Sequence, residues 1–97
     1  MILRIVQMTF REDKVAEFIS IFEERKSTIK GFKGCTHLEL WQDPKHENIF
    51  FTYSNWDSET DLDHYRFSEF FKDTWGKTKA LFADKPQAWS VIRKSIT

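Results

Sequence analysis

The stretch from Ile49 to Trp75 holds the side chains of this chain best suited to chemistry on a small organic molecule. Trp56 stands at the end of a predicted strand, where its ring could stack on an aromatic ligand. His64 follows one short predicted helix later, and histidine side chains exchange protons near neutral pH. Together these residues indicate a pocket that has an aromatic wall and a group for proton handling.

Each of these residues also has a purely structural interpretation. Trp56 could pack in the core between a sheet and a helix, and His64 could face solvent or bond the backbone. Gln7 interrupts an otherwise apolar strand face that begins with Leu3 and Ile5. A buried amide needs hydrogen-bond partners, so Gln7 is either a polar contact in the pocket or a satisfied amide in the core.

Four further side chains are candidates of a weaker kind. Phe71 and Trp75 recur at helical spacing, so they could form apolar pocket walls or simply the core side of a helix. Tyr53 and Tyr65 could each donate a hydrogen bond to a substrate oxygen. Cys35 is the only cysteine and is expected to be a small buried apolar residue.

No cofactor site is predicted. The His, Cys and acidic residues lack metal-ligand spacings such as H-x-x-x-H or C-x-x-C. Neither G-x-G-x-x-G nor a P-loop occurs, so a nucleotide or flavin would have no recognisable cradle. Any reaction of this chain is therefore expected to proceed without a cofactor.

The size and charge of the chain exclude several classes of protein. Its 97 residues predict one domain spanning residues 1–97. Fifteen basic residues balance fifteen acidic ones, which disfavours a nucleic-acid partner. No apolar run reaches the roughly 18 residues of a membrane span, and the first ten residues predict a strand rather than a signal peptide. A single cysteine fits a reducing compartment, so we expect a cytoplasmic protein.

Alternation of apolar and polar residues predicts four strands. They are expected over Ile2–Phe10, Cys35–Gln42, Ile49–Trp56 and Gln87–Ile96. The short polar loop between the second and third strands indicates an antiparallel hairpin.

Helical patterns fill the two longer gaps between these strands. The first helix is expected to begin at Asp13 as N-cap and to end at Gly31, with Gly31 free to take a positive φ. Ser58 and Ser68 are both typical N-cap residues, so the second helical region is expected to break near Phe67.

The resulting order β-α-β-β-α-β predicts an α+β, ferredoxin-like fold, in which two helices cover one face of a four-stranded antiparallel sheet. The other face has no cover within the chain. By alternation it should carry apolar side chains from the set Met8, Trp41, Ile49, Phe51 and Tyr53. Two sheets packed face to face would shield them from water, so we expect a homodimer through this open face.

Several segments resemble the antibiotic biosynthesis monooxygenase (ABM) family of dimeric α+β barrels, and the resemblance covers nearly the whole chain. The similar segments are Arg11–Phe18, Gly31–Cys35, Trp56–Ser58, Leu62–His64 and Ser68–Phe71. The resemblance implies a cofactor-independent monooxygenase that oxidises a small aromatic phenol or hydroquinone with O₂. In that interpretation His64 handles protons, Trp56 and other aromatic residues line the pocket, and Gln7 is a polar contact.

Two other functions stay open on the same resemblance. The haem-degrading branch of the family uses an Asn, a Trp and an iron-binding His, and this chain has Gln7, Trp56 and Trp75 at those positions. Only the Trp matches, so haem degradation is disfavoured. A non-catalytic binding or stress-associated domain of the same fold is the main alternative, because the sequence shows no tight catalytic constellation.

Overall fold

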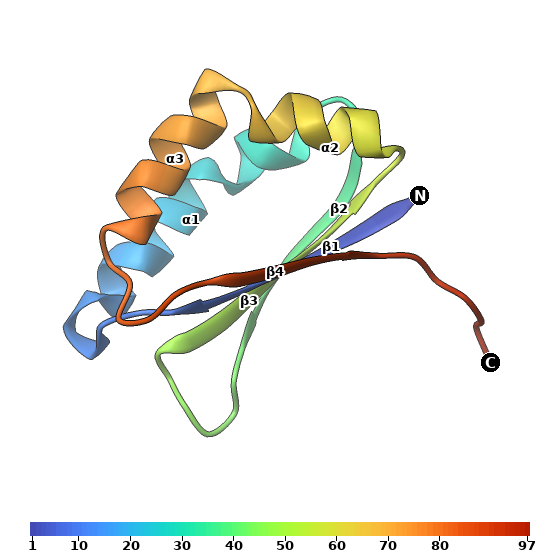
Figure 1. Cartoon of the computed structure of the whole chain (residues 1–97). Helices are drawn as coiled ribbons and strands as arrows, with labels where there is room; N and C mark the ends of the chain where they lie inside the picture. The colour runs from blue at the N-terminus through green and yellow to red at the C-terminus, as the bar shows by residue number, and fades with distance from the viewer.

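One antiparallel sheet runs through the molecule (Figure 1). Its strands lie in the order β2-β3-β1-β4. The computed structural model describes residues 1–97. The strands are β1 Ile2–Thr9, β2 Cys35–Gln42, β3 Ile49–Trp56 and β4 Gln87–Val91. All three pairings are antiparallel, which confirms the predicted ferredoxin-like sheet.

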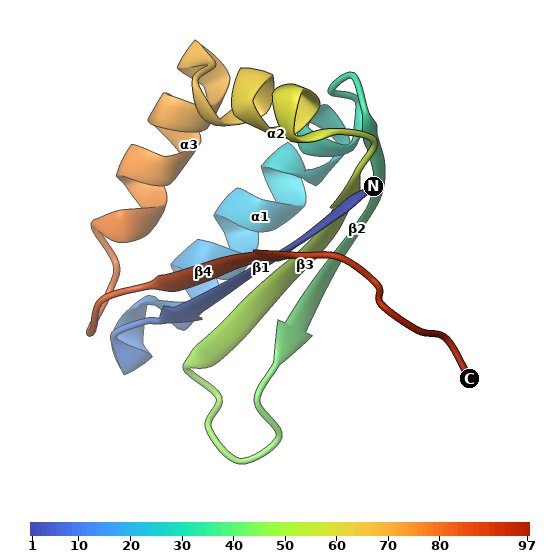
Figure 2. The same cartoon turned by 45° about the vertical axis from the view of Figure 1, so that its right-hand side comes forward.

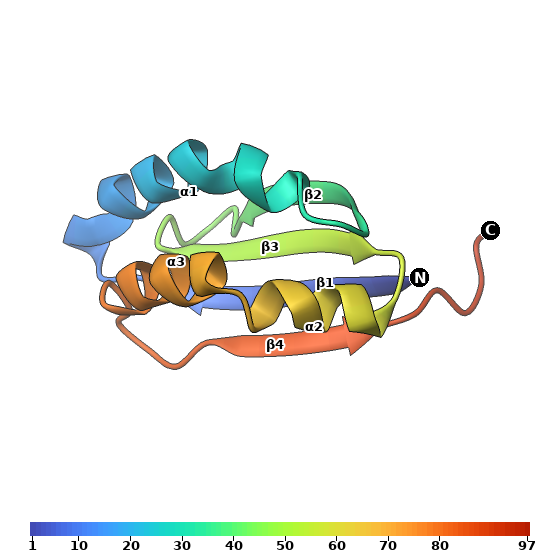
Figure 3. The ribbon, with the colours of Figure 1, turned by 90° about the horizontal axis from the view of Figure 1, so that it is seen from above.

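The helices cover one face of this sheet and leave the other face open (Figure 2). They are the short 3-10 helix η1 Glu12–Lys14 and the α-helices α1 Val15–Lys30, α2 Glu59–Arg66 and α3 Glu69–Lys79. Seen from above, α1 lies on the β2 side of the sheet, and α2 and α3 lie on the β1 side (Figure 3). The two predicted helical regions are therefore present, and the second of them is divided in two.

The division of the second helical region follows from its two serine caps. The Ser58 side chain accepts a hydrogen bond from the Asp61 backbone N–H at 3.1 Å. Ser68 does the same for the Phe71 N–H at 3.1 Å. Each serine hydroxyl accepts from a backbone N–H that has no partner in the first turn of its helix. Because Ser68 begins a new helix in this way, α2 ends just before it. The predicted break near Phe67 is confirmed.

Two expectations about α1 are wrong. Asp13 is not its N-cap, because η1 precedes the helix and Lys14 takes the cap position without a side-chain bond. Gly31 keeps a right-handed φ of −80°, and its N–H still bonds the carbonyls of the last helical turn. The positive φ falls instead on Gly34, at 86°.

The last strand is also shorter than expected, ending at Val91 rather than Ile96. β4 pairs only with β1, and the register places Val91 opposite Leu3. The register with β1 does not continue past Val91. Lacking a partner strand, the residues beyond Val91 extend away from the sheet (Figure 1).

The register also decides which side chains face the helices. The even-numbered residues of β1 and β3 point toward the helices, and the odd-numbered ones lie on the open face. Met8 was expected on the open face, and this is wrong, because it is buried in the core beneath the helices. Tyr53 does lie on the open face, where it stacks on Trp41 of β2.

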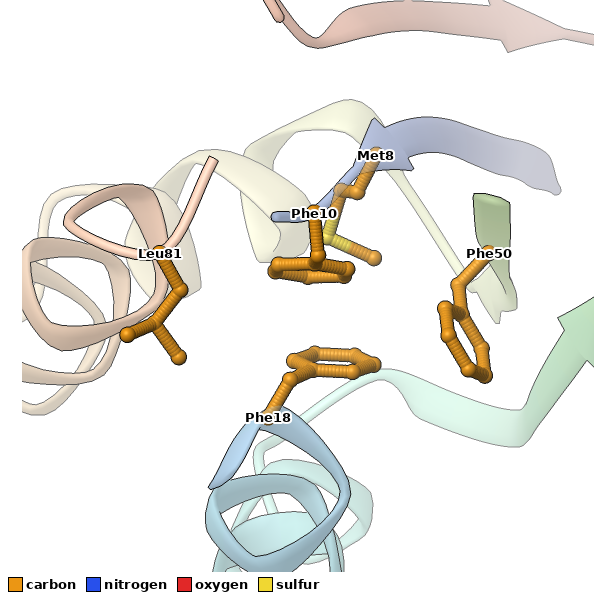
Figure 4. Close-up of a cluster of buried hydrophobic side chains, with 5 residues drawn as sticks. All are labelled: Met8, Phe10, Phe18, Phe50 and Leu81. Carbon is orange, nitrogen blue, oxygen red and sulfur yellow. The ribbon is translucent and has the colours of Figure 1, made fainter. Parts of the chain in front are cut away.

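The main core is a cluster of five buried side chains (Figure 4). Phe10 and Phe18 stack at its centre, with ring centroids 4.1 Å apart. Its members are Met8, Phe10, Phe18, Phe50 and Leu81. A second, smaller cluster joins Cys35, Trp56 and Leu62 at the other end of the helical layer.

Gly34 and Gly76 provide a matched test of this backbone geometry. Gly34→Ala should destabilise the fold by about 1–3 kcal/mol, because its φ is positive and an added Cβ would lie 2.5 Å from the Asp61 Cβ. Gly76→Ala should instead stabilise it by about 1 kcal/mol, because Gly76 is inside α3 and its added Cβ would meet nothing within 4 Å. Urea denaturation of both variants measures the difference, and an equally stable Gly34→Ala variant would contradict the turn geometry.

Candidate active site

A cavity of about 110 Å³ lies between the sheet and the helical layer. Twelve of its 19 lining residues are hydrophobic. The main core contributes Met8 and Phe18 to the lining, and the smaller cluster contributes Trp56 and Leu62. The cavity therefore lies between the two buried clusters.

Aromatic rings form one wall of this cavity. Trp56 is fully buried and stacks on Tyr65, with ring centroids 5.1 Å apart. Phe71 meets the edge of Tyr65 at 5.1 Å and stacks on Trp75 at 5.8 Å. The Trp56 Nε1 donates to the hydroxyl of Ser54 at 2.9 Å, which fixes the plane of the indole. The structure thus brings together three of the predicted site residues, Trp56, Phe71 and Trp75.

Gln7 and Tyr53 are not brought to the cavity. Both are odd-numbered residues of the two central strands, so they lie on the open face of the sheet. There the Tyr53 hydroxyl accepts a hydrogen bond from Arg93 at 3.1 Å. Successive side chains of a strand point to opposite faces of the sheet. The side chains of Gln7 and Tyr53 therefore point away from the helices and from the cavity.

His64 also lies outside the cavity, on the exposed side of α2. Leu62, Tyr65 and Arg66 of the same helix line the cavity and define its inner side. His64 is two residues after Leu62, a rotation of about 200° around a helix of 3.6 residues per turn. No hydrogen bond or ion pair connects its imidazole to any cavity residue.

Tyr65, one of the two tyrosines considered from the sequence as hydrogen-bond donors to a substrate, does line the cavity. Its hydroxyl makes no hydrogen bond within the chain, although its ring packs between Trp56 and Phe71. Burial, together with the nearby Cys35, raises the pKa of Tyr65 well above its ordinary range. The hydroxyl therefore stays protonated at neutral pH and is free to donate to a bound molecule. Its spacing from Leu62, three residues along α2, places both side chains on the same face of the helix.

Three arginines also reach the cavity, which sequence reasoning missed. Arg25 bonds both Asp73 and the Thr74 hydroxyl at 2.7 Å. Arg66 pairs with Asp63, while its buried Nε has no acceptor. Arg4 donates to the Ser90 hydroxyl at 3.0 Å. Arg4 shares the helix-facing side of β1 with apolar residues, and this was the signal in the sequence.

The surroundings of Arg4 are electrostatically unfavourable for a cation. Burial lowers the pKa of Arg4, and the positive charge of Arg66 lowers it further. Asp63 acts in the opposite direction, but its effect is the smallest of the three. The cavity therefore combines an apolar interior with two neighbouring guanidinium groups.

The structure contains neither a metal-ligand cluster nor a helix that could span a membrane. No three or more His, Cys, Asp or Glu side chains converge in an arrangement that could hold a metal ion. None of the helices has the length and apolar character that crossing a bilayer requires.

Fold and site together define a ferredoxin-like α+β domain with an aromatic-walled cavity beneath its helices. Residues 1–76 match the family model described as antibiotic biosynthesis monooxygenase. The chain therefore belongs to the antibiotic biosynthesis monooxygenase family, as the resemblance implied. No protein with a curated function is matched by the sequence.

Solved structures agree with the fold along the whole chain. An antibiotic biosynthesis monooxygenase is similar with a TM-score of 0.91 at 16% identity, covering 98% of this chain and all of that one. A conserved protein from Methanosarcina mazei Go1 has a TM-score of 0.90 at 19% identity, with 97% and 94% of the two chains covered. Rv0793 from Mycobacterium tuberculosis has a TM-score of 0.88 at 13% identity, with 98% and 96% covered. At these identities the likeness concerns the fold alone.

Proposed function

We propose that this protein is a cofactor-independent monooxygenase that oxidises a single-ring phenol or hydroquinone with O₂. The observation that carries the proposal is the apolar cavity walled by Trp56, Tyr65, Phe71 and Trp75 in a member of this family. Aromatic walls favour a flat aromatic ligand, which can stack on them or meet them edge to face.

The volume of the cavity favours a small substrate. An apolar protein cavity of about 150 Å³ admits benzene. At about 110 Å³, this cavity needs only modest side-chain movement to take one ring. A fused multi-ring substrate would require the helical layer to separate from the sheet. We therefore place the substrate among single-ring phenols.

The chemistry of such a substrate does not require a bound electron carrier. A deprotonated hydroquinone is rich enough in electrons to reduce O₂ itself. One oxygen atom enters the ring, the other leaves as water, and the substrate loses two hydrogen atoms in becoming a hydroxyquinone. The protein then supplies a dry site, orientation and hydrogen-bond donors for the developing anion.

Within the cavity, Trp56, Phe71 and Trp75 would hold the ring, and the Tyr65 hydroxyl would donate to a substrate oxygen. Trp56 cannot turn freely, because Ser54 and Tyr65 fix its indole. Proton handling by His64 finds no support in its exposed position on α2. We assign the acceptor of the substrate proton to water at the cavity mouth.

Oxygen consumption by cavity variants tests this proposal. Thr52 lines the cavity, and Thr52→Phe should lower hydroquinone-dependent oxygen uptake about tenfold or more, because the added ring occupies the substrate volume. Thr60→Phe adds the same ring on the exposed surface of α2 and should leave the rate unchanged. Both rates are measured with a chelator present. Equal oxygen uptake by the two variants would show that the reaction does not take place in the cavity.

His64→Ala separates two assignments of the proton-handling step in the same assay. The exposed position of His64 predicts an unchanged rate. A fall in the rate of about tenfold or more would show instead that His64 handles the proton.

We also propose that the protein is a homodimer joined through the open face of the sheet. Exposed aromatic and aliphatic side chains lie on this face, among them Trp41, Trp89 and Val91. A second copy presents the same apolar surface, so that face-to-face packing shields both sheets from water.

A non-catalytic binding domain is the second candidate. The observation in its favour is that no His, Cys, Asp or Glu lines the cavity, so no conventional general base faces a ligand. Ligand binding without any oxygen uptake would establish it. Haem degradation fits less well, because Trp75 has no free nitrogen lone pair for iron and the cavity is far smaller than the roughly 300 Å³ of ordinary ligand pockets.

A further inference from the structure

Arg4 and Arg66 are out of place in a cavity that is otherwise mostly apolar. Arg4 comes from β1 and Arg66 from the last turn of α2, so two separate elements direct a guanidinium to the same space. Both side chains are half-buried, which places them where the cavity meets solvent. A ligand ring inside the cavity would therefore point one edge toward this pair.

The charges around the cavity do not balance. Arg25 is neutralised by Asp73, which it bonds at 2.7 Å. Arg66 has Asp63, but no ion pair joins Arg4 to any carboxylate. No Asp or Glu lines the cavity itself. Two neighbouring guanidinium groups thus share one carboxylate, which leaves about one positive charge uncompensated at the cavity mouth.

The arginine pair also has unused hydrogen-bonding capacity. The Nε of Arg66 is buried and has no acceptor in the chain. A buried donor without a partner costs free energy, and so does the repulsion between two nearby cations. An anion at this position would relieve both costs, and a planar carboxylate matches the fork of guanidinium donors.

We propose that Arg4 and Arg66 bind a carboxylate carried by the ring, so that the ligand is a single-ring aromatic acid. The inference rests on the proposed function only in placing the ring within the cavity. It names the substrate class as hydroxylated benzoates rather than neutral phenols. A carboxylate is already ionised at neutral pH, so its binding involves no deprotonation.

Anaerobic titration calorimetry tests the proposal without turnover. The two probes are 2,5-dihydroxybenzoate and hydroquinone, which share the ring and its hydroxyls and differ in the carboxylate. The acid should bind about tenfold or more tightly than the neutral compound, as expected for charge-assisted hydrogen bonds. This preference should weaken as the salt concentration rises.

Arginine variants test whether Arg4 and Arg66 cause the preference for the acid over the neutral probe. In Arg4→Gln and Arg66→Gln the two probes should bind with similar affinity. Lys33→Gln removes one positive charge from an exposed loop position and should retain the wild-type preference. Unchanged preference in both arginine variants, or equal wild-type affinities for the two probes, would overturn the proposal.

A thermal unfolding measurement separates recognition from a structural role. Removing one of two repelling cations should leave the melting temperature of ligand-free Arg4→Gln equal to or above that of the wild type. Loss of the preference together with a clearly lower melting temperature would indicate that Arg4 merely supports the fold, and would also overturn the proposal. Tight binding of the acid without aerobic oxygen uptake would refute the monooxygenase and leave this inference intact.

Discussion

Phe10→Ala is expected to lower the free energy of unfolding by about 3–5 kcal/mol, the usual cost of emptying a phenylalanine site in a core. Phe10 is 0% exposed and lies at the centre of the main core. It stacks on Phe18 at 4.1 Å and also contacts Phe50 and Phe82. These rings come from different elements that cannot all move inward, so the variant should keep most of the cavity it creates.

The control for this prediction is the same substitution at an exposed ring. Phe67 is 71% exposed, at the junction between α2 and α3. Phe67→Ala should change the free energy of unfolding by less than about 0.5 kcal/mol. Urea denaturation of the two variants measures both values. Similar losses in the two would show that the cluster around Phe10 is not the core.

The second large effect concerns assembly. The wild-type protein should sediment at micromolar concentration as a particle of twice 11.7 kDa, and Trp89→Glu should sediment as a single chain. Trp89 is 41% exposed on the open face, opposite Ile5 of β1. In a face-to-face dimer its ring would be buried, and a carboxylate there would lose its hydration without gaining a partner.

Phe67→Glu is the matched control for assembly. It introduces the same charge at an exposed aromatic position on the helical side, away from the open face. This variant should remain dimeric. If Phe67→Glu dissociates and Trp89→Glu does not, the dimer interface lies on the helical side. A monomeric wild-type protein would contradict the dimer proposal.

Two strands and the break in the second helical region could be predicted from the sequence because local patterns determine them. The bounds of β2 and β3 followed from alternation, and the break between α2 and α3 followed from Ser58 and Ser68. One error was local, because η1 takes up Asp13, the expected N-cap of α1. Another arose where a partner strand decides the outcome. The pairing of β4 with β1 stops where Val91 lies opposite Leu3, and no pattern within β4 itself reveals this end point.

The candidate site was only partly predictable for a similar reason. Trp56, Phe71 and Trp75 were found because aromatic residues at strand ends and helical spacings are visible in the sequence. His64 was selected for its chemistry, yet the rotation of α2 turns it outward and turns Tyr65 inward. The proximity of Arg4 and Arg66 depends on how α2 crosses β1, which tertiary packing alone determines.

Isotope labelling is the most direct test of the central claim that the cavity supports oxygenation of an aromatic ring. The purified protein, treated with a chelator, would be supplied with ¹⁸O₂ and 2,5-dihydroxybenzoate or hydroquinone. We predict a ring product that carries one ¹⁸O atom, with the second label in water, and a strongly reduced yield in Thr52→Phe. Unlabelled quinone with hydrogen peroxide, or no product above the protein-free rate, would contradict the account.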